Sequence, residues 1–232
     1  QFIDSFTVVH MLQTYGLGFR EAIMQKGIYD RGASFIQIGL IVTTTFSFVL
    51  IPLLTDAMSD HNHVLMNRYT NASLKITLLI SVAAGIGLIN ILPMMNHVFF
   101  KTDQLSFTLS IYTLTVIGVS LIMMDIALLQ VMNQIRPIFI GVMSGLLFKI
   151  IFNVIFIHFM GILGASISTV LSLMIFVTIL HYEVVKYYRF NHMRAFIVKL
   201  MSALIIMSVV IQGLRMLLPL VGRLGSLIEL LI

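Results

Sequence analysis

The sequence predicts an all-α fold, a polytopic bundle of transmembrane helices. Of the 232 residues, 59% are hydrophobic and 10% are charged, and the mean hydropathy is +1.05. An ordinary soluble domain carries about 25% charged residues. The apolar runs match the roughly 20 residues that a helix needs to cross a bilayer, and they lack the alternation of barrel strands. Because lipid offers no hydrogen-bond partners, the protein must satisfy every backbone polar group itself, as helices and closed barrels do, so helices are the expected structure.

Charged residues and Gly, Pro or Asn gaps divide the chain into about seven complete spans and a partial eighth. The predicted spans cover residues 1–15, 33–55, 74–97, 106–131, 137–159, 162–185 and 196–218, with a partial span over 222–232. Residues 16–31 mix apolar and charged side chains, which fits either a short interfacial helix or a solvated loop. Since the last run is about half the required length, we expect a fragment of a longer polytopic protein.

The basic charge fits a membrane protein better than a nucleic-acid-binding protein. The net charge is +5, but the 14 Lys and Arg residues lie mostly in short gaps between spans. There they flank a bilayer, and we expect no nucleic-acid partner. The most concentrated cluster, residues 186–199 with Tyr182, Tyr187 and Tyr188 as interfacial anchors, predicts that this end is cytoplasmic. We expect a multi-pass protein of the cell membrane, which is the cytoplasmic membrane of a bacterium.

Three ionisable residues, Asp4, Asp125 and Lys149, fall inside predicted spans. Such residues cost several kcal/mol unless they face water or a partner, so each is a functional candidate. Counting about 1.5 Å per residue places Asp4 and Lys149 near the bilayer midplane. They either face one hydrated cavity and bind or balance a charge, or form a buried pair that fixes helix packing. Asn153 shares a helical face with Lys149 and either contacts a ligand or bonds to a neighbouring helix.

Asp125 and the histidines give weaker signals. Asp125 lies about 10 Å from the gap at residues 133–136, so we expect it to reach interfacial water and to couple to an ion or balance a charge. His61 and His63 form an H-x-H pair, but no third set of ligands has a defined spacing. We therefore expect a solvated loop and no metal site. No cofactor is indicated beyond a coupling cation of unknown identity.

Motifs for covalent chemistry are missing from the sequence. With no cysteine, disulfides and thiol nucleophiles are excluded. The sequence contains no phosphate-binding loop, H-E-x-x-H helix or G-x-S-x-G elbow. We therefore expect a protein that is not an enzyme.

Residues 149–172, KIIFNVIFIHFMGILGASISTVLS, carry the most informative pattern. They resemble the Lys…Asn…Gly-x-x-Gly-Ala…Thr pattern of the polysaccharide-flippase branch of the multidrug/oligosaccharidyl-lipid/polysaccharide exporter superfamily. Residues 2–8, FIDSFTV, and 27–39, GIYDRGASFIQIG, look like the matching regions of the sporulation-protein-B and MurJ-like flippases. The resemblance covers most of residues 1–180, and the order and spacing of its motifs are more specific than any one motif.

The resemblance implies two pseudosymmetric six-helix lobes around a central cavity, with two additional helices in the lipid-precursor flippases. Residues 1–187 would then be the second lobe, residues 188–232 would be additional C-terminal helices, the last one incomplete, and the N-terminal lobe would lie outside this chain. For Arg31 the resemblance implies a contact with a lipid-linked pyrophosphate, which an Arg fork suits.

The leading functional hypothesis is a flippase for a lipid-linked oligosaccharide or peptidoglycan precursor. It would work by alternating access in cell-wall or polysaccharide biosynthesis. Arg31, Lys149 and Asn153 would bind the lipid-linked sugar pyrophosphate, and Asp4 or Asp125 would couple to an ion. The alternatives are a cation-coupled multidrug exporter of the same superfamily and a non-catalytic membrane subunit. A membrane-embedded glycosyltransferase fits less well because the predicted loops are short.

Overall fold

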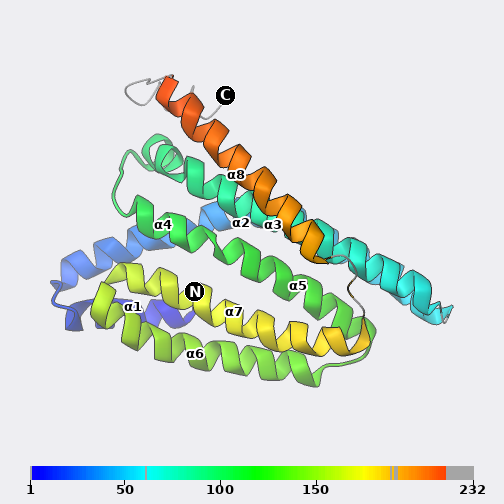
Figure 1. The fold of residues 1–232 in the computed structure, drawn as a ribbon. Helices are drawn as coiled ribbons and strands as arrows, with labels where there is room; N and C mark the ends of the chain where they lie inside the picture. Colours follow the sequence, from blue (N-terminus) through cyan, green and yellow to red (C-terminus); the bar gives the residue numbers. More distant parts are fainter. Residues whose placement is uncertain (1, 61, 189, 191–192, 218–232) are drawn as a thin grey trace.

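We describe the fold from a computed structural model, which describes residues 2–60, 62–188, 190 and 193–217. Within these ranges the chain forms eight α-helices (Figure 1). They are α1 (Phe2–Thr14), α2 (Phe19–Ser59), α3 (His63–Phe100), α4 (Ser106–Thr113), α5 (Thr115–Val131), α6 (Arg136–Met160), α7 (Ile162–Tyr187) and α8 (Met193–Leu217).

The predicted all-α membrane bundle is confirmed, although its number of complete spans is smaller. Among the described residues, α3, the α4–α5 unit, α6, α7 and α8 are each long and apolar enough to cross a membrane. The bent helix α2 makes a sixth. Helix α1 has 13 residues, fewer than a full crossing needs. The predicted partial span over 222–232 lies outside the described residues.

The prediction that residues 16–31 form a separate connection between two spans is wrong for most of their length. Residues 15–18 form the turn, and the rest is the first part of the 41-residue helix α2. Lys26 and Asp30 pair across one helical turn, and Lys26 is buried. Helix α2 measures about 60 Å along its axis at 1.5 Å per residue, twice the hydrocarbon thickness, and it bends by 44° near residue 42.

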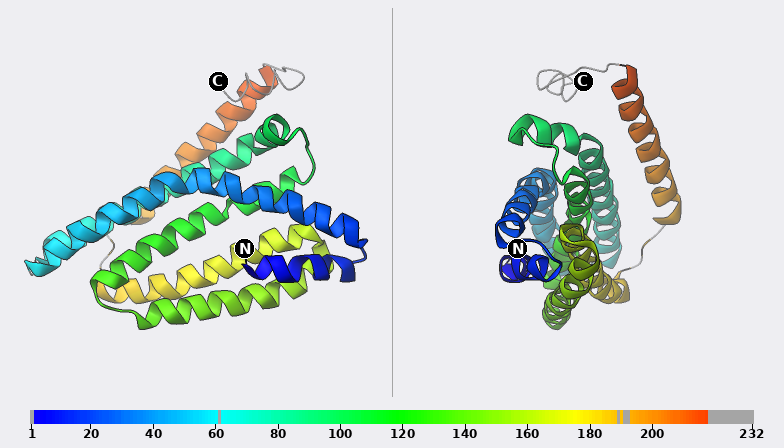
Figure 2. Two further views of the ribbon diagram at one scale, coloured as in Figure 1. Left: turned by 180° about the vertical axis from the view of Figure 1, so that it is seen from behind. Right: turned by 90° about the vertical axis from the view of Figure 1, so that its left-hand side faces the viewer.

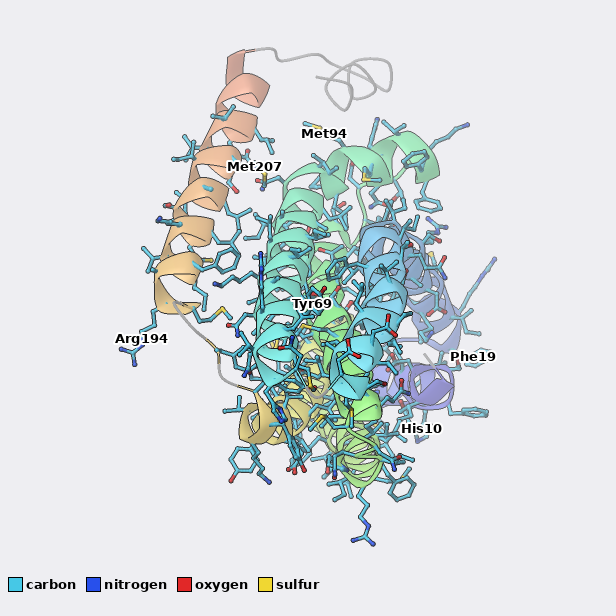
Figure 3. The ribbon with its side chains drawn as sticks, turned by 90° about the vertical axis from the view of Figure 1, so that its right-hand side faces the viewer. His10, Phe19, Tyr69, Met94, Arg194 and Met207 are labelled. Carbon is cyan, nitrogen blue, oxygen red and sulfur yellow. The ribbon has the colours of Figure 1, made fainter. Side chains whose placement is uncertain are left out.

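The connections between the helices gather at two ends of the bundle. Figure 1 shows the α1–α2 and α6–α7 turns at one end and the α5–α6 connection at the other. This arrangement matches the alternation of spans that the sequence predicts. Arg194 of α8 and Phe19 of α2 both point away from the bundle (Figure 3). Tyr188 was expected to anchor at the interface, but it is buried at 2% exposure because it packs into the core with Leu180 and Val184.

Helices α6 and α7 form a close antiparallel hairpin. Gly161 makes the turn with φ 58° and ψ −141°, a conformation that side chains with a Cβ rarely adopt. A Cβ at Gly164 would lie 2.1 Å from the carbonyl oxygen of Phe156. Small residues that allow this close approach are typical of helix pairs in membranes. The hairpin therefore fixes the relative position of Lys149 and the start of α7.

The buried side chains form two cores, one toward each end. The first joins α1, α2, α3 and α4 with parts of α5, α6 and α7, around residues such as Leu12, Tyr29 and Leu109. The second joins the end of α2 with α3, α5 and α7 around Leu54, Leu128 and Leu180. Helix α8 packs along α3 at the side of the bundle (Figure 2). Exposed apolar side chains cover the outer faces of α6 and α8, which suits contact with lipid.

Candidate functional site

The predicted proximity of Asp4 and Lys149 is confirmed. The Lys149 Nζ lies 2.8 Å from Asp4 Oδ1, and both side chains are buried. Asp4 comes from the first turn of α1, and Lys149 from the middle of α6. A buried charge is tolerated when it is paired and hydrogen-bonded, and this pair meets that condition.

Further oxygen atoms from α7 complete the surroundings of the Lys149 ammonium. Its Nζ donates to Thr169 Oγ1 at 2.5 Å, to Ser168 Oγ at 3.1 Å and to the Ala165 carbonyl oxygen at 3.3 Å. An ammonium has three N–H donors, so in this conformation the oxygens from α1 and α7 already use its donor capacity. An anion that binds Lys149 must therefore displace one of them.

Asn153 extends this cluster by one turn of α6. Its Nδ2 donates to Asp4 Oδ1 and to Thr7 Oγ1, each at 3.0 Å, and its Oδ1 accepts from the Ser168 hydroxyl. The interpretation of Asn153 as an interhelical hydrogen-bonding residue is confirmed, and a ligand contact stays a prediction. We call Asp4, Thr7, Lys149, Asn153, Ser168 and Thr169 the Asp4–Lys149 cluster.

Tyr29 connects the Asp4–Lys149 cluster to α2. Its hydroxyl lies 3.1 Å from Thr169 Oγ1, and its ring stacks on Tyr112 with a centroid distance of 4.5 Å. Tyr29 is 1% exposed. Four helices, α1, α2, α6 and α7, therefore meet at one buried polar network.

A cavity of about 280 Å³ opens beside the pair. Asp4, Lys149, Thr169 and Ser172 supply its polar wall, and apolar residues of α1, α6 and α7 supply the rest. Sites for drug-sized ligands usually measure about 300–1,000 Å³. This cavity is therefore large enough for only part of a larger headgroup.

Arg31 does not line this cavity. Its guanidinium lies 4.9 Å from the centroid of the Phe100 ring, at the C-terminal end of α3. The structure therefore does not bring Arg31 and Lys149 together, and the contact with a pyrophosphate that the resemblance implies for Arg31 stays a prediction.

Asp125 lies apart from the Asp4–Lys149 cluster, in the second core. It was expected to reach interfacial water, but its side chain is 0% exposed, because the helices of the second core enclose it. Its Oδ1 lies 3.4 Å from His181 Nδ1 on α7, whereas Oδ2 has no hydrogen-bond partner in the part of the chain that the structure describes. Asp125 therefore depends on one long contact.

The histidine pair falls only partly within the described residues. His63 begins α3, and His61 lies outside the described residues. In the described part of the chain, no three His, Cys, Asp or Glu side chains lie close enough to hold a metal ion.

The comparisons with known proteins agree with a membrane protein of this class. No protein-family model matches the chain. It is 26% identical to the uncharacterized membrane protein YabM of Bacillus subtilis over 233 residues, which cover 99% of this chain and 44% of YabM. It is also 26% identical to the lipid II flippase MurJ of Bacillus subtilis over 143 residues, which cover 59% of this chain and 26% of MurJ.

This chain is a multi-pass membrane protein related to MurJ-like proteins. It spans less than half the length of these two relatives. The division into a second lobe over 1–187 and additional helices over 188–232 stays a prediction.

Sequence reasoning missed several residues of these sites. His181 lies inside a predicted span, so the rule that drew attention to Asp125 also applied to it. Thr7 lies three residues after Asp4, so the helical period placed it on the same face of α1 as Asp4. Tyr29 had no such signal, because residues 16–31 were not expected to belong to the second long helix.

Proposed function

We propose that the protein containing this chain is a membrane transporter that flips a lipid-linked sugar pyrophosphate by alternating access. The observation that carries this proposal is the Asp4–Lys149 pair, a buried charge pair beside a cavity in a chain related to MurJ-like proteins. A packing contact could be made without charges, whose burial in lipid is costly. A positive group beside a cavity suits an anionic headgroup.

Lys149 is the residue that would receive the pyrophosphate. Because Asp4 and α7 already engage its ammonium, the anion would compete with Asp4. Release of Asp4 would loosen α1 from α6 and couple binding to a helix movement. Such a coupling requires that the anion interacts differently with the two states.

The size of the cavity supports a binding site that this chain shares with a second lobe. At about 280 Å³, it would hold the phosphate part of the headgroup, and a second lobe would supply the remaining contacts. Arg31 would then act from the mouth of the bundle rather than inside this cavity.

The test uses the full-length protein reconstituted in liposomes with a fluorescent lipid-linked sugar pyrophosphate. The key variant is the double substitution Asp4→Asn/Lys149→Met, which removes both charges and so avoids an unpaired buried charge. We expect it to fold with near-normal thermal stability and to flip the lipid at least tenfold more slowly. Lys101→Met, which removes an exposed cation at the end of α3, is the matched control and should flip normally.

A stable double variant with full activity would overturn the proposal and leave the pair a packing device. Wild-type protein that fails to flip the lipid but exports cationic drugs would instead favour a multidrug exporter.

A further inference from the structure

The second core holds a buried acid–base pair that the proposed site does not use. Asp125 of α5 and His181 of α7 are separated by 3.4 Å between Oδ1 and Nδ1. The Asp125 side chain is fully buried, while 34% of the His181 side chain is exposed. One member of the pair is thus shielded and the other reaches the outside.

His181 lines a cavity of about 420 Å³ that is open on one side. Leu74 and Leu78 of α3, Tyr182 of α7 and Ile197 of α8 form much of its wall. His181 lies about 9 Å from the end of α7, counted at 1.5 Å per residue, so water has a short path to the imidazole. The ring also stacks on Phe190, with centroids 5.3 Å apart, which holds its orientation.

We propose that Asp125 and His181 form a proton-binding site that exchanges protons with water through this cavity. One proton adds to the pair and no covalent bond between heavy atoms changes. The pair then passes from a net charge of −1, with a neutral imidazole and a carboxylate, to a net charge of 0. Among the described residues Asp125 Oδ2 has no hydrogen-bond partner, so the unprotonated pair buries a poorly compensated charge, which is costly.

Other titratable groups do not supply this compensation. At this end, the helices packed around the pair carry Asp56 of α2, His63, Arg68, Tyr69 and Lys75 of α3, Arg136 of α6, Tyr182, Glu183, Lys186 and Tyr187 of α7, and Arg194 and Lys199 of α8. Among the described residues none of these forms an ion pair or hydrogen bond with Asp125 or His181, and Glu183 pairs with Lys186 at 2.6 Å. Tyr188 stays a neutral phenol because burial raises its pKa to about 12.

The site is distinct from the Asp4–Lys149 cluster. No member of that cluster lines the cavity beside His181, and the two lie with different cores. If the proposed transport function holds, this pair names the proton as the coupling ion, but proton binding itself does not depend on that function.

The test is a pH titration of the purified chain, labelled with ¹⁵N-histidine, in detergent micelles between about pH 5 and 8. We expect the His181 imidazole to protonate in one step. In Asp125→Asn, the loss of the carboxylate should lower the midpoint by at least about one pH unit, a tenfold loss of proton affinity. His158, an exposed residue of α6, is the internal control, and its midpoint should not move.

Equal His181 midpoints in wild type and Asp125→Asn would overturn the proposal, as would a His181 that never protonates in this range. If Asp125→Asn does not fold, His181→Gln is examined by infrared spectroscopy. The pH at which the Asp125 carboxyl band appears should change, and an unchanged band would contradict the pair. A normal titration in a protein that does not flip lipid would overturn the flippase proposal and leave the proton site intact.

Discussion

Two regions of this bundle each bury a carboxylate, and they satisfy it in opposite ways. Asp4 has an ammonium at 2.8 Å and an amide at 3.0 Å. Asp125 has one imidazole contact at 3.4 Å, and its other oxygen has no partner within the described ranges. The first charge is neutralised by fixed groups from neighbouring helices, and the second can be neutralised by a proton from water. The comparison teaches that a buried charge stabilises the packing where its partners are permanently charged or polar. Where its partner titrates, the same kind of buried charge can respond to pH.

The largest expected effect comes from removing one member of the Asp4–Lys149 pair. Asp4→Asn leaves the Lys149 ammonium buried without its counter-charge, which should lower the free energy of unfolding by about 3–5 kcal/mol. Thermal unfolding in detergent measures this loss. Adding Lys149→Met should restore most of the stability, since no buried charge then remains. If the double variant is as unstable as the sum of the single variants, the two residues do not act as a pair.

The α6–α7 hairpin, which positions Lys149 against α7, can be strained without changing a charged residue. Gly164→Ala would place a Cβ 2.1 Å from the Phe156 carbonyl oxygen, and the backbone must move, at a cost of about 1–3 kcal/mol. Gly87→Ala in α3 is the matched control, because nothing lies within 4 Å of a Cβ built there. We expect lower thermal stability in Gly164→Ala alone and an unchanged His181 titration in both. A shifted titration would show that the two regions are coupled through α7.

The second region should tolerate loss of its charge. Asp125→Asn removes one long hydrogen bond and also a charge that is costly to bury, so we expect the free energy of unfolding to change by about 1 kcal/mol or less. Denaturant titration of Asp125→Asn and Asp4→Asn under the same conditions compares their free energies of unfolding. A loss as large as that of Asp4→Asn would mean that Asp125 is a structural anchor.

A contact outside both regions gives the smallest effect and a baseline. Asn90 of α3 donates to Ser208 Oγ of α8 at 3.0 Å. Single hydrogen bonds between membrane helices average about 0.6 kcal/mol, so Ser208→Ala should lower stability by about that amount. Ser202→Ala is the control, because the Ser202 hydroxyl bonds within its own helix to Lys199. A drop above about 2 kcal/mol would show that α8 depends on this contact far more than that average.

The sequence by itself determined the helical class and the depth of the buried charges. Hydropathy and the rise per residue are local properties, so they placed Asp4 and Lys149 at one level without knowledge of the fold. The same local pattern failed at residues 16–31, where mixed apolar and charged side chains predicted a separate connection. Lys26 and Asp30 instead pair within one continuous helix.

Only the tertiary structure decided which side chains meet. The rotation of each helix and the choice of its neighbours depend on close packing, for example at Gly164, and not on composition. Packing gave Asp125 the imidazole of His181 and buried Tyr188 in the second core. It also turned Arg31 toward Phe100 and away from the cavity of Lys149. Depth along a helix follows from counting residues, whereas a partner across a helix interface follows from how the helices fit together.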